Sequence, residues 1–231
     1  MLKFYLVLNI TGIKKVVKLI FIVSPGRCAS TLLLQMINQK VAHDLNKTAD
    51  SVGFSNFPFE KDSREKFQVF HTHSLGDCKN ILNEDLVYYI LRKNLVDYIA
   101  SHLISQDLQT WHWLPNQTPT ISIFKKMPPE NQIKIIIRQL YWYRDSYKKY
   151  SKKFHSVHLI FYEDFVTNFS VPGIDLSNTL DQVCYFATTP VDKTQYFDYD
   201  HLTELVKKYN NDSIYFDFDF NFERVRNQSL K

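Results

Sequence analysis

The stretch LIFIVSPGRCASTLLLQMI, residues 19–37, combines groups that bind anions. An apolar run leads into a Pro-Gly turn and small polar residues, and an apolar helical pattern follows. The N–H groups at the start of a helix, the hydroxyls of Ser30 and Thr31 and the guanidinium of Arg27 can all donate hydrogen bonds to phosphate. The ATP-binding pattern G-x-x-x-x-G-K-S/T would place Gly at Thr31, and its lysine is missing. The stretch indicates an anion site of another kind, although a plain structural turn explains it equally well by itself.

A pair of histidines supplies groups for proton transfer. His71 and His73 lie two positions apart in FQVFHTHSLGD, where a predicted strand ends, so both side chains project from the same face. A neutral imidazole can act as a general base, and a protonated one can stabilise negative charge. Two hydrogen-bonded histidines without a chemical role are the structural alternative. A metal site with Cys78 as third ligand would lack a fourth ligand and regular spacing, so no metal is predicted.

Two further strand ends carry charged side chains. In VYYILRKNLVDYIASHL, Arg92 and Lys93 end an apolar run, and Ser101 follows about two turns into a predicted helix. The Ser101 hydroxyl can share an anion with either basic residue. In VHLIFYEDFV the run ends near Glu163 and Asp164, which suit the first turn of a helix. These acidic residues are interpreted as helix-start residues, not as catalysts.

Alternating strands and helices are expected to position these residues. Apolar runs rich in β-branched and aromatic residues predict buried strands, and apolar residues at helical spacing predict helices between them. The predicted strands are 18–23, 67–70, 86–91 and 157–161, and the predicted helices are 30–41, 95–105, 130–153 and 201–209, the last capped by Asp200. This order predicts an α/β domain of three layers, in which helices flank a central parallel sheet. Residues 46–66 and 106–129 are predicted to be irregular, and an edge strand is expected within 215–231.

Composition limits the class of protein. The chain of 231 residues suits one domain spanning 1–231. Its net charge of +4, without a basic run, argues against a nucleic-acid partner. Three separated cysteines give no disulfide framework, which favours a reducing compartment. Lysines interrupt the apolar N-terminus, so neither a membrane span nor a signal peptide is expected, and the predicted location is the cytoplasm.

The four stretches together resemble the sulfotransferases that use 3′-phosphoadenosine 5′-phosphosulfate (PAPS). SPGRCASTLL resembles their 5′-phosphosulfate loop, HTHSL their Lys-Thr-His stretch, LRKNLVDYIAS their 3′-phosphate motif and LIFYEDF their Tyr-Glu-Asp stretch. The resemblance covers roughly residues 19–165 and depends on the order of the four stretches. It implies a P-loop-like fold, binding of PAPS and of its product 3′-phosphoadenosine 5′-phosphate (PAP), and no metal. It also accounts for a phosphate loop without the lysine of ATP-binding proteins.

The resemblance assigns the 5′-phosphosulfate contacts to the loop after the first predicted strand of the sheet. Its residues are Arg27, Cys28, Ala29, Ser30 and Thr31. Arg27 takes the family's Lys/Arg position. Ala29 stands where the family has Gly, and because a Cβ disfavours the left-handed backbone, φ at Ala29 is expected to avoid positive values.

The resemblance places His73 at the catalytic base and His71 at the position of the family's lysine. Many carbohydrate-directed relatives instead use a Glu after the first helix, which makes Glu60 the reserve base. His73 is favoured over Glu60. Arg27 and His71 are expected to stabilise charge on the sulfonate and on the departing phosphate.

The 3′-phosphate contacts implied by the resemblance are Ser101 and one of the two basic residues before it. Counting back from Ser101 along the family's motif leads to Lys93, whereas some relatives with a basic pair point to Arg92. Arg92 is ranked first because a guanidinium binds phosphate through two hydrogen bonds. Tyr162 matches the tyrosine of Tyr-Glu-Asp and is expected at the nucleotide. The family's late Arg-Lys-Gly motif is absent, which points to a compact microbial or viral member.

The expected activity is in-line transfer of a sulfuryl group from PAPS to a hydroxyl of a carbohydrate or small metabolite. Two other functions fit the same strand-loop-helix pattern: a nucleotide or nucleoside kinase of the P-loop type, which requires magnesium, and a non-catalytic PAP-binding protein. The missing Gly-Lys-Ser/Thr argues against the kinase. His71 in place of Lys and Ala29 in place of Gly keep the non-catalytic alternative open.

Overall fold

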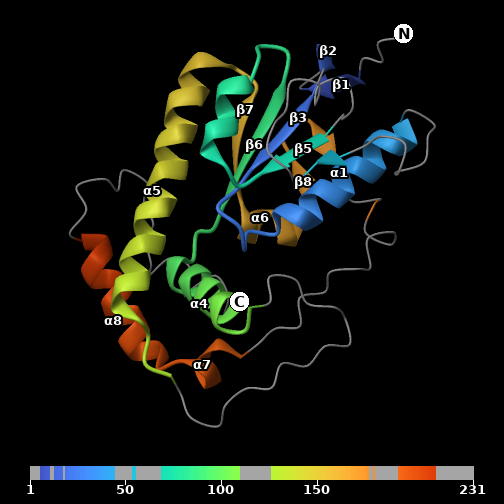
Figure 1. Cartoon of the computed structure of the whole chain (residues 1–231). Coiled ribbons are helices and arrows are strands. Elements are labelled where there is room, and N and C mark those ends of the chain that lie inside the picture. Colours follow the sequence, from blue (N-terminus) through green and yellow to red (C-terminus); the bar gives the residue numbers. More distant parts are fainter. Residues whose placement is uncertain are drawn as a thin grey trace. The chain divides into compact units, whose positions relative to one another are not determined.

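The computed structural model contains a parallel β-sheet with helices that follow its strands (Figure 1). The structure describes residues 6–10, 13–17, 19–44, 54–55, 69–109, 126–176, 179 and 192–211. The chain divides into two compact units. Residues 1–91 and 142–184 form the first unit, and residues 92–141 and 185–231 form the second unit. Within the described ranges, no helix is long and apolar enough to cross a membrane.

A five-stranded sheet forms the core of the first unit. Its strands are β3 (Ile20–Val23), β4 (Phe54–Ser55), β5 (Val69–Thr72), β6 (Leu86–Leu91) and β7 (Val157–Phe161), in the spatial order β4-β5-β3-β6-β7. All neighbouring strands run parallel. Every residue of β3, β5 and β6 is buried, as expected for a sheet covered on both faces. The predicted α/β class and the central parallel sheet flanked by helices are confirmed.

The predicted strand boundaries hold with small shifts. β6 and β7 occupy the predicted residues, whereas β3 begins two residues after the predicted start. β5 runs to Thr72 and not to residue 70, which places His71 inside the strand. The two-residue strand β4 lies in a segment predicted to be irregular. Among the described strands it pairs with β5, and it is too short to give a periodic pattern, which is why the sequence does not reveal it.

Helices of the first unit follow the strands that they cover. α1 (Ser30–Asp44) follows β3 and contacts β3 and β5, and α6 (Tyr162–Asn168) follows and contacts β7. The part of α5 (Glu130–Lys153) from Trp142 onward also belongs to this unit. α1 starts at the predicted residue, and α5 has both predicted ends. The apolar spacing of these helices therefore predicts them well.

Two small hairpins and a 3₁₀ helix complete the described part of the first unit. β1 (Leu6–Ile10) pairs antiparallel with β2 (Ile13–Val17), and β8 (Ser170–Val171) pairs antiparallel with β9 (Ile174–Asp175). Gly173, in the turn of the second hairpin, has a φ of +83°, which glycine adopts without a clash of a Cβ. The 3₁₀ helix η1 (Leu75–Asn80) follows β5.

The described part of the second unit is helical. It contains α4 (Leu95–Asp107), α7 (Lys193–Tyr196), α8 (Tyr199–Asn211) and the residues of α5 before Trp142. α4 contacts both α7 and α8. α4 starts at the predicted residue because Asn94 caps it, with its Oδ1 accepting the Asp97 N–H at 3.0 Å. The edge strand expected within 215–231 and residues 110–125 of the irregular segment lie outside the described residues.

The start of α8 corrects the prediction that Asp200 caps this helix. The helix begins at Tyr199, and Asp198 is its cap. The Asp198 carboxylate accepts the His201 N–H at 3.1 Å, and its carbonyl accepts the Leu202 N–H at 2.9 Å. A tertiary hydrogen bond from the Asp198 N–H to the Lys126 carbonyl, at 3.3 Å, fixes the backbone where the helix begins. Both aspartates suit a cap, and this long-range contact decides between them.

Candidate functional site

The backbone of the loop after β3, residues 24–29, is left-handed at three positions. Gly26, Arg27 and Ala29 have φ of +86°, +52° and +55°. The expectation that Ala29 avoids a positive φ is therefore wrong. The Ala29 carbonyl accepts the first helical hydrogen bond of α1, from the Leu33 N–H at 2.9 Å, so the chain must reverse sharply before Ser30. The closure of helix onto strand imposes this conformation, at a cost of about 1–2 kcal/mol for each non-glycine residue.

Replacing Ala29 with glycine is expected to raise the free energy of unfolding by about 0.5–1 kcal/mol. Glycine removes the left-handed penalty of about 1–2 kcal/mol and adds about 0.4–1 kcal/mol of backbone entropy to the unfolded chain. Urea unfolding of wild type and Ala29→Gly measures the difference. Ala100→Gly in the middle of α4 is the matched control and should destabilise the protein. An Ala29→Gly variant less stable than wild type would contradict the left-handed backbone of Ala29.

The loop presents hydrogen-bond donors in a form that suits an anion. The N–H groups of the first helical turn have no acceptor inside α1, and this turn carries no acidic side chain. Cys28 and Ser30 are 0% and 3% exposed, so both residues pack inside the loop. Arg27 and Thr31 are half-buried and can add side-chain donors. A helix dipole without an opposing carboxylate favours negative charge at this point.

His73 lies directly against this loop. Its Nδ1 is 2.7 Å from the carbonyl oxygen of Ser24, and its Cε1 would be 3.8 Å from a Cβ added to Gly26. A carbonyl oxygen can only accept, so Nδ1 must carry the proton of this hydrogen bond. In the neutral ring, Nε2 is then the nitrogen with the lone pair. The exposed imidazole of His73 therefore has a proton-accepting atom beside the loop.

The segment after β5 is held by contacts that sequence patterns do not signal. The Tyr143 hydroxyl of α5 donates a hydrogen bond to the carbonyl oxygen of His73. The Thr72 hydroxyl donates to the buried carboxylate of Asp77 at 2.6 Å and accepts the Ser74 N–H at 2.8 Å. Burial raises the pKa of the Tyr143 phenol, so it keeps the proton that it donates.

His71 stands beside His73, as the spacing predicts. The ring centroids are 4.5 Å apart, with the planes nearly perpendicular at 81°. His71 is 2% exposed and pairs in register with Ile22 of β3, whereas His73 lies beyond the end of β5 and is exposed. Of the two histidines, His73 is the one whose ring is open to solvent.

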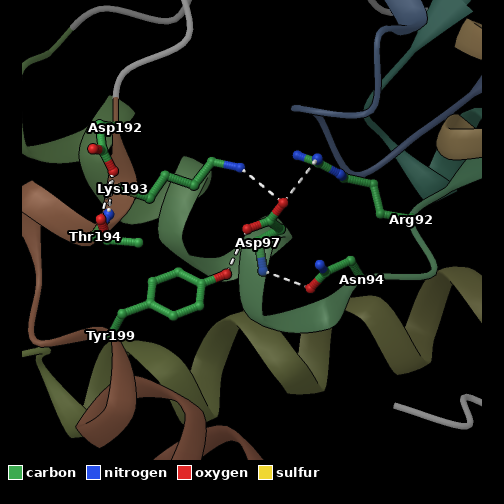
Figure 2. Close-up of polar contacts among 7 residues, drawn as sticks. All are labelled: Arg92, Asn94, Asp97, Asp192, Lys193, Thr194 and Tyr199. Carbon is green, nitrogen blue, oxygen red and sulfur yellow. Dashed lines mark hydrogen bonds and ion pairs between the residues drawn. The ribbon is translucent and has the colours of Figure 1, made fainter. Parts of the chain in front are cut away.

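In the second unit, Asp97 contacts several charged and polar side chains (Figure 2). Its Oδ2 lies 3.2 Å from Lys193 Nζ and 4.0 Å from an Nη of Arg92, and its Oδ1 accepts a hydrogen bond from the Tyr199 hydroxyl. Burial alone would raise the pKa of Asp97, but Lys193, Tyr199 and Arg92 together lower it below its usual value. Asp97 therefore stays ionised and links α4 to α7 and α8.

The remaining predicted site residues are distributed as follows. Tyr162 is the first residue of α6 in the first unit and is half-buried. Arg92, Lys93 and Ser101 are half-buried residues of the second unit, and Arg92 directly follows the last residue of β6 in the chain. Glu60, the reserve base, lies outside the described residues.

Sequence reasoning missed the residues that act through long-range contacts. The partners of these residues lie far away in sequence, as for Tyr143 and His73, which are 70 positions apart. The other residues of this kind are Ser24 and Lys193. No local pattern could identify them. Asp97 did have a signal, since the spacing Asn94-x-x-Asp97 matches a helix capping motif.

The sequence matches no protein-family model and no curated protein.

Proposed function

We propose that this protein is a sulfotransferase that moves a sulfuryl group from PAPS to a hydroxyl of a carbohydrate or small metabolite. One observation carries the proposal: His73 lies against the loop after β3, with its Nδ1 hydrogen-bonded to the Ser24 carbonyl at 2.7 Å. That hydrogen bond leaves Nε2 as the proton acceptor. Transfer of an anionic group to a hydroxyl needs a base that accepts the hydroxyl proton and donors that stabilise the negative charge of the group.

The loop in the first unit fits the 5′-phosphosulfate of PAPS. Backbone N–H groups of the first turn of α1 with the side chains of Arg27 and Thr31 would hold the anion, without a lysine or a magnesium ion. The strand order supports a nucleotide at this edge of the sheet. β3 and β6 are neighbours in the sheet. After β3 the chain continues to β4 at one edge of the sheet, and after β6 it continues to β7 at the other edge. Such a topological switch point is where α/β proteins bind ligands, at the carboxyl ends of the strands.

PAPS would supply an activated sulfuryl group when bound, and His73 would accept a proton. As the acceptor oxygen forms its bond to sulfur, Nε2 takes the hydroxyl proton and the bond from sulfur to the 5′-phosphate oxygen breaks, so that PAP leaves with the bonding electrons. Arg27 and the loop N–H groups would stabilise the charge on the leaving phosphate. Preorganised donors of this kind contribute about 3–4 kcal/mol each in comparable sites.

We assign the 3′-phosphate of PAPS to Arg92 in the first place, with Ser101 and Lys93 as further contacts. The ion pair between Arg92 and Asp97 supports this ranking because it limits the conformations of the guanidinium before a ligand arrives. We also propose that the protein acts in the cytoplasm on small molecules, not on nucleic acid. The wide separation of the three cysteines in the sequence supports a reducing compartment.

Calorimetric titration with PAP, ADP and ATP, without and with magnesium, tests the proposal. We expect PAP to bind more tightly than ADP, with no dependence on magnesium. Arg92→Ala should weaken PAP binding about 10–100-fold and leave ADP binding nearly unchanged, because ADP lacks the 3′-phosphate. Lys93→Ala is the matched comparison and should have the smaller effect. Absence of PAP binding, or ATP binding that requires magnesium, would overturn the sulfotransferase and favour a kinase.

A further inference from the structure

We propose that Tyr143 is a positioning residue that holds His73 in the tautomer needed of a base. The inference rests on the proposed role of His73. Two anchors from different elements act on this residue: the Ser24 carbonyl fixes the ring at Nδ1, and the Tyr143 hydroxyl fixes the backbone at the carbonyl oxygen. Together they fix the ring of His73 beside the loop after β3 and leave Nε2 as its proton acceptor.

The Ser24 anchor is itself fixed. Ser24 is 0% exposed, and its N–H donates to the Thr72 carbonyl at 3.2 Å, which extends the pairing of β3 with β5 by one residue. Its hydroxyl oxygen accepts the Gly26 N–H at 3.2 Å. The carbonyl that receives the His73 proton therefore belongs to rigid backbone. If the proton were on Nε2 of His73, the lone pair of Nδ1 would face a lone pair of the Ser24 carbonyl oxygen, and the two would repel each other.

The Tyr143 anchor is equally well supported. Tyr143 is 7% exposed on α5, and the same helix is fastened to β6 one turn further on, where the Ser146 and Tyr89 hydroxyls lie 2.8 Å apart. The ring of Tyr147 also contacts Tyr89, with centroids 5.7 Å apart. The Tyr143 hydroxyl therefore holds the backbone of His73, the first residue after β5. Loss of this hydroxyl should let the His73 backbone shift and lengthen the hydrogen bond at Nδ1.

The nitrogen chemical shifts of the His73 imidazole, measured by NMR without any nucleotide, test this inference. Wild type is expected to hold the neutral ring as the Nδ1–H tautomer. Tyr143→Phe should raise the share of the Nε2–H tautomer about 3–10-fold, the equilibrium effect of one neutral hydrogen bond. The matched control is Tyr147→Phe, which removes a hydroxyl from the same helix and should leave the tautomer unchanged. With a working acceptor, Tyr143→Phe should lower kcat by a similar factor and leave KM for PAPS unchanged.

The outcomes separate this inference from the proposed function. An Nε2–H tautomer in wild type, or an unaltered tautomer in a folded Tyr143→Phe variant, would overturn the positioning role even if PAPS is turned over. The wild-type spectrum alone can refute the proposal if the variant does not fold. Failure to bind PAP, combined with the expected tautomer shift, would refute the sulfotransferase and support the role of Tyr143 in fixing His73.

Discussion

Replacing His73 with alanine is expected to lower the rate of sulfuryl transfer by about 10²–10⁴-fold, the usual contribution of a general base. PAP affinity should change little, because the loop donors and Arg92 remain. The rate of PAP release from PAPS, with an acceptor found by screening hydroxyl compounds, measures the first effect. Calorimetric titration with PAP measures the second. Loss of kcat with retained PAP binding would assign His73 to proton transfer and not to nucleotide binding.

Two further variants complete this experiment. His43→Ala is the control for loss of an imidazole, since His43 lies in the last turn of α1 with a side chain that is 85% exposed. It should keep the wild-type rate. Glu60→Ala tests the reserve base and is expected to retain most activity. If Glu60→Ala abolished transfer while His73→Ala left it intact, the assignment of the base would be wrong.

Asp97→Asn is expected to lower the free energy of unfolding by about 1–2 kcal/mol at neutral pH. The carboxylate interacts with Lys193, Arg92 and the Tyr199 hydroxyl, and an amide of the same shape leaves both cations without their negative partner. The side chain is 32% exposed, so solvent screens part of the interaction and the value lies toward the low end for hydrogen bonds to charged groups. Urea unfolding at pH 7 measures the change.

The pH dependence of this difference gives a second test. The pKa of Asp97 is lower in the folded protein than the value of about 3.9 for an unfolded aspartate, so its stabilisation is fully present above about pH 5. It is lost as the pH falls through the folded-state pKa, where the folded protein must take up a proton. The stabilities of wild type and Asp97→Asn should therefore converge in strong acid.

Asp44→Asn is the matched control for this test. It removes the i,i+4 ion pair with Lys40 and the contact with His43 on the surface of α1, and should cost about 0.3–0.5 kcal/mol. A constant difference between wild type and Asp97→Asn down to strong acid would contradict an ionised Asp97 as the source of the stability.

The class of fold can be predicted from the sequence because the signals for strands and helices are local. β6 is a continuous apolar run of the kind that a doubly covered parallel sheet needs, and β7 is apolar apart from His158. α5 keeps an apolar stripe over its 24 residues. The start of α1 after the Pro-Gly turn follows from the same spacing. Two histidines at i and i+2 beside a strand end had to share a face, and their rings do meet. In these cases the pattern and the structure depend on neighbouring residues of the chain.

The conformations and contacts that make the site specific arise from tertiary packing. Ala29 is left-handed because α1 must close onto β3, a demand stronger than the preference of one alanine. The proton on His73 Nδ1 depends on Ser24 and its backbone position on Tyr143, residues that are 49 and 70 positions away in sequence. The charge of Asp97 depends on Lys193 from another helix. Local sequence sets which residues can form strands, helices and donors, whereas hydrogen bonds and ion pairs between distant segments exist only after those elements pack.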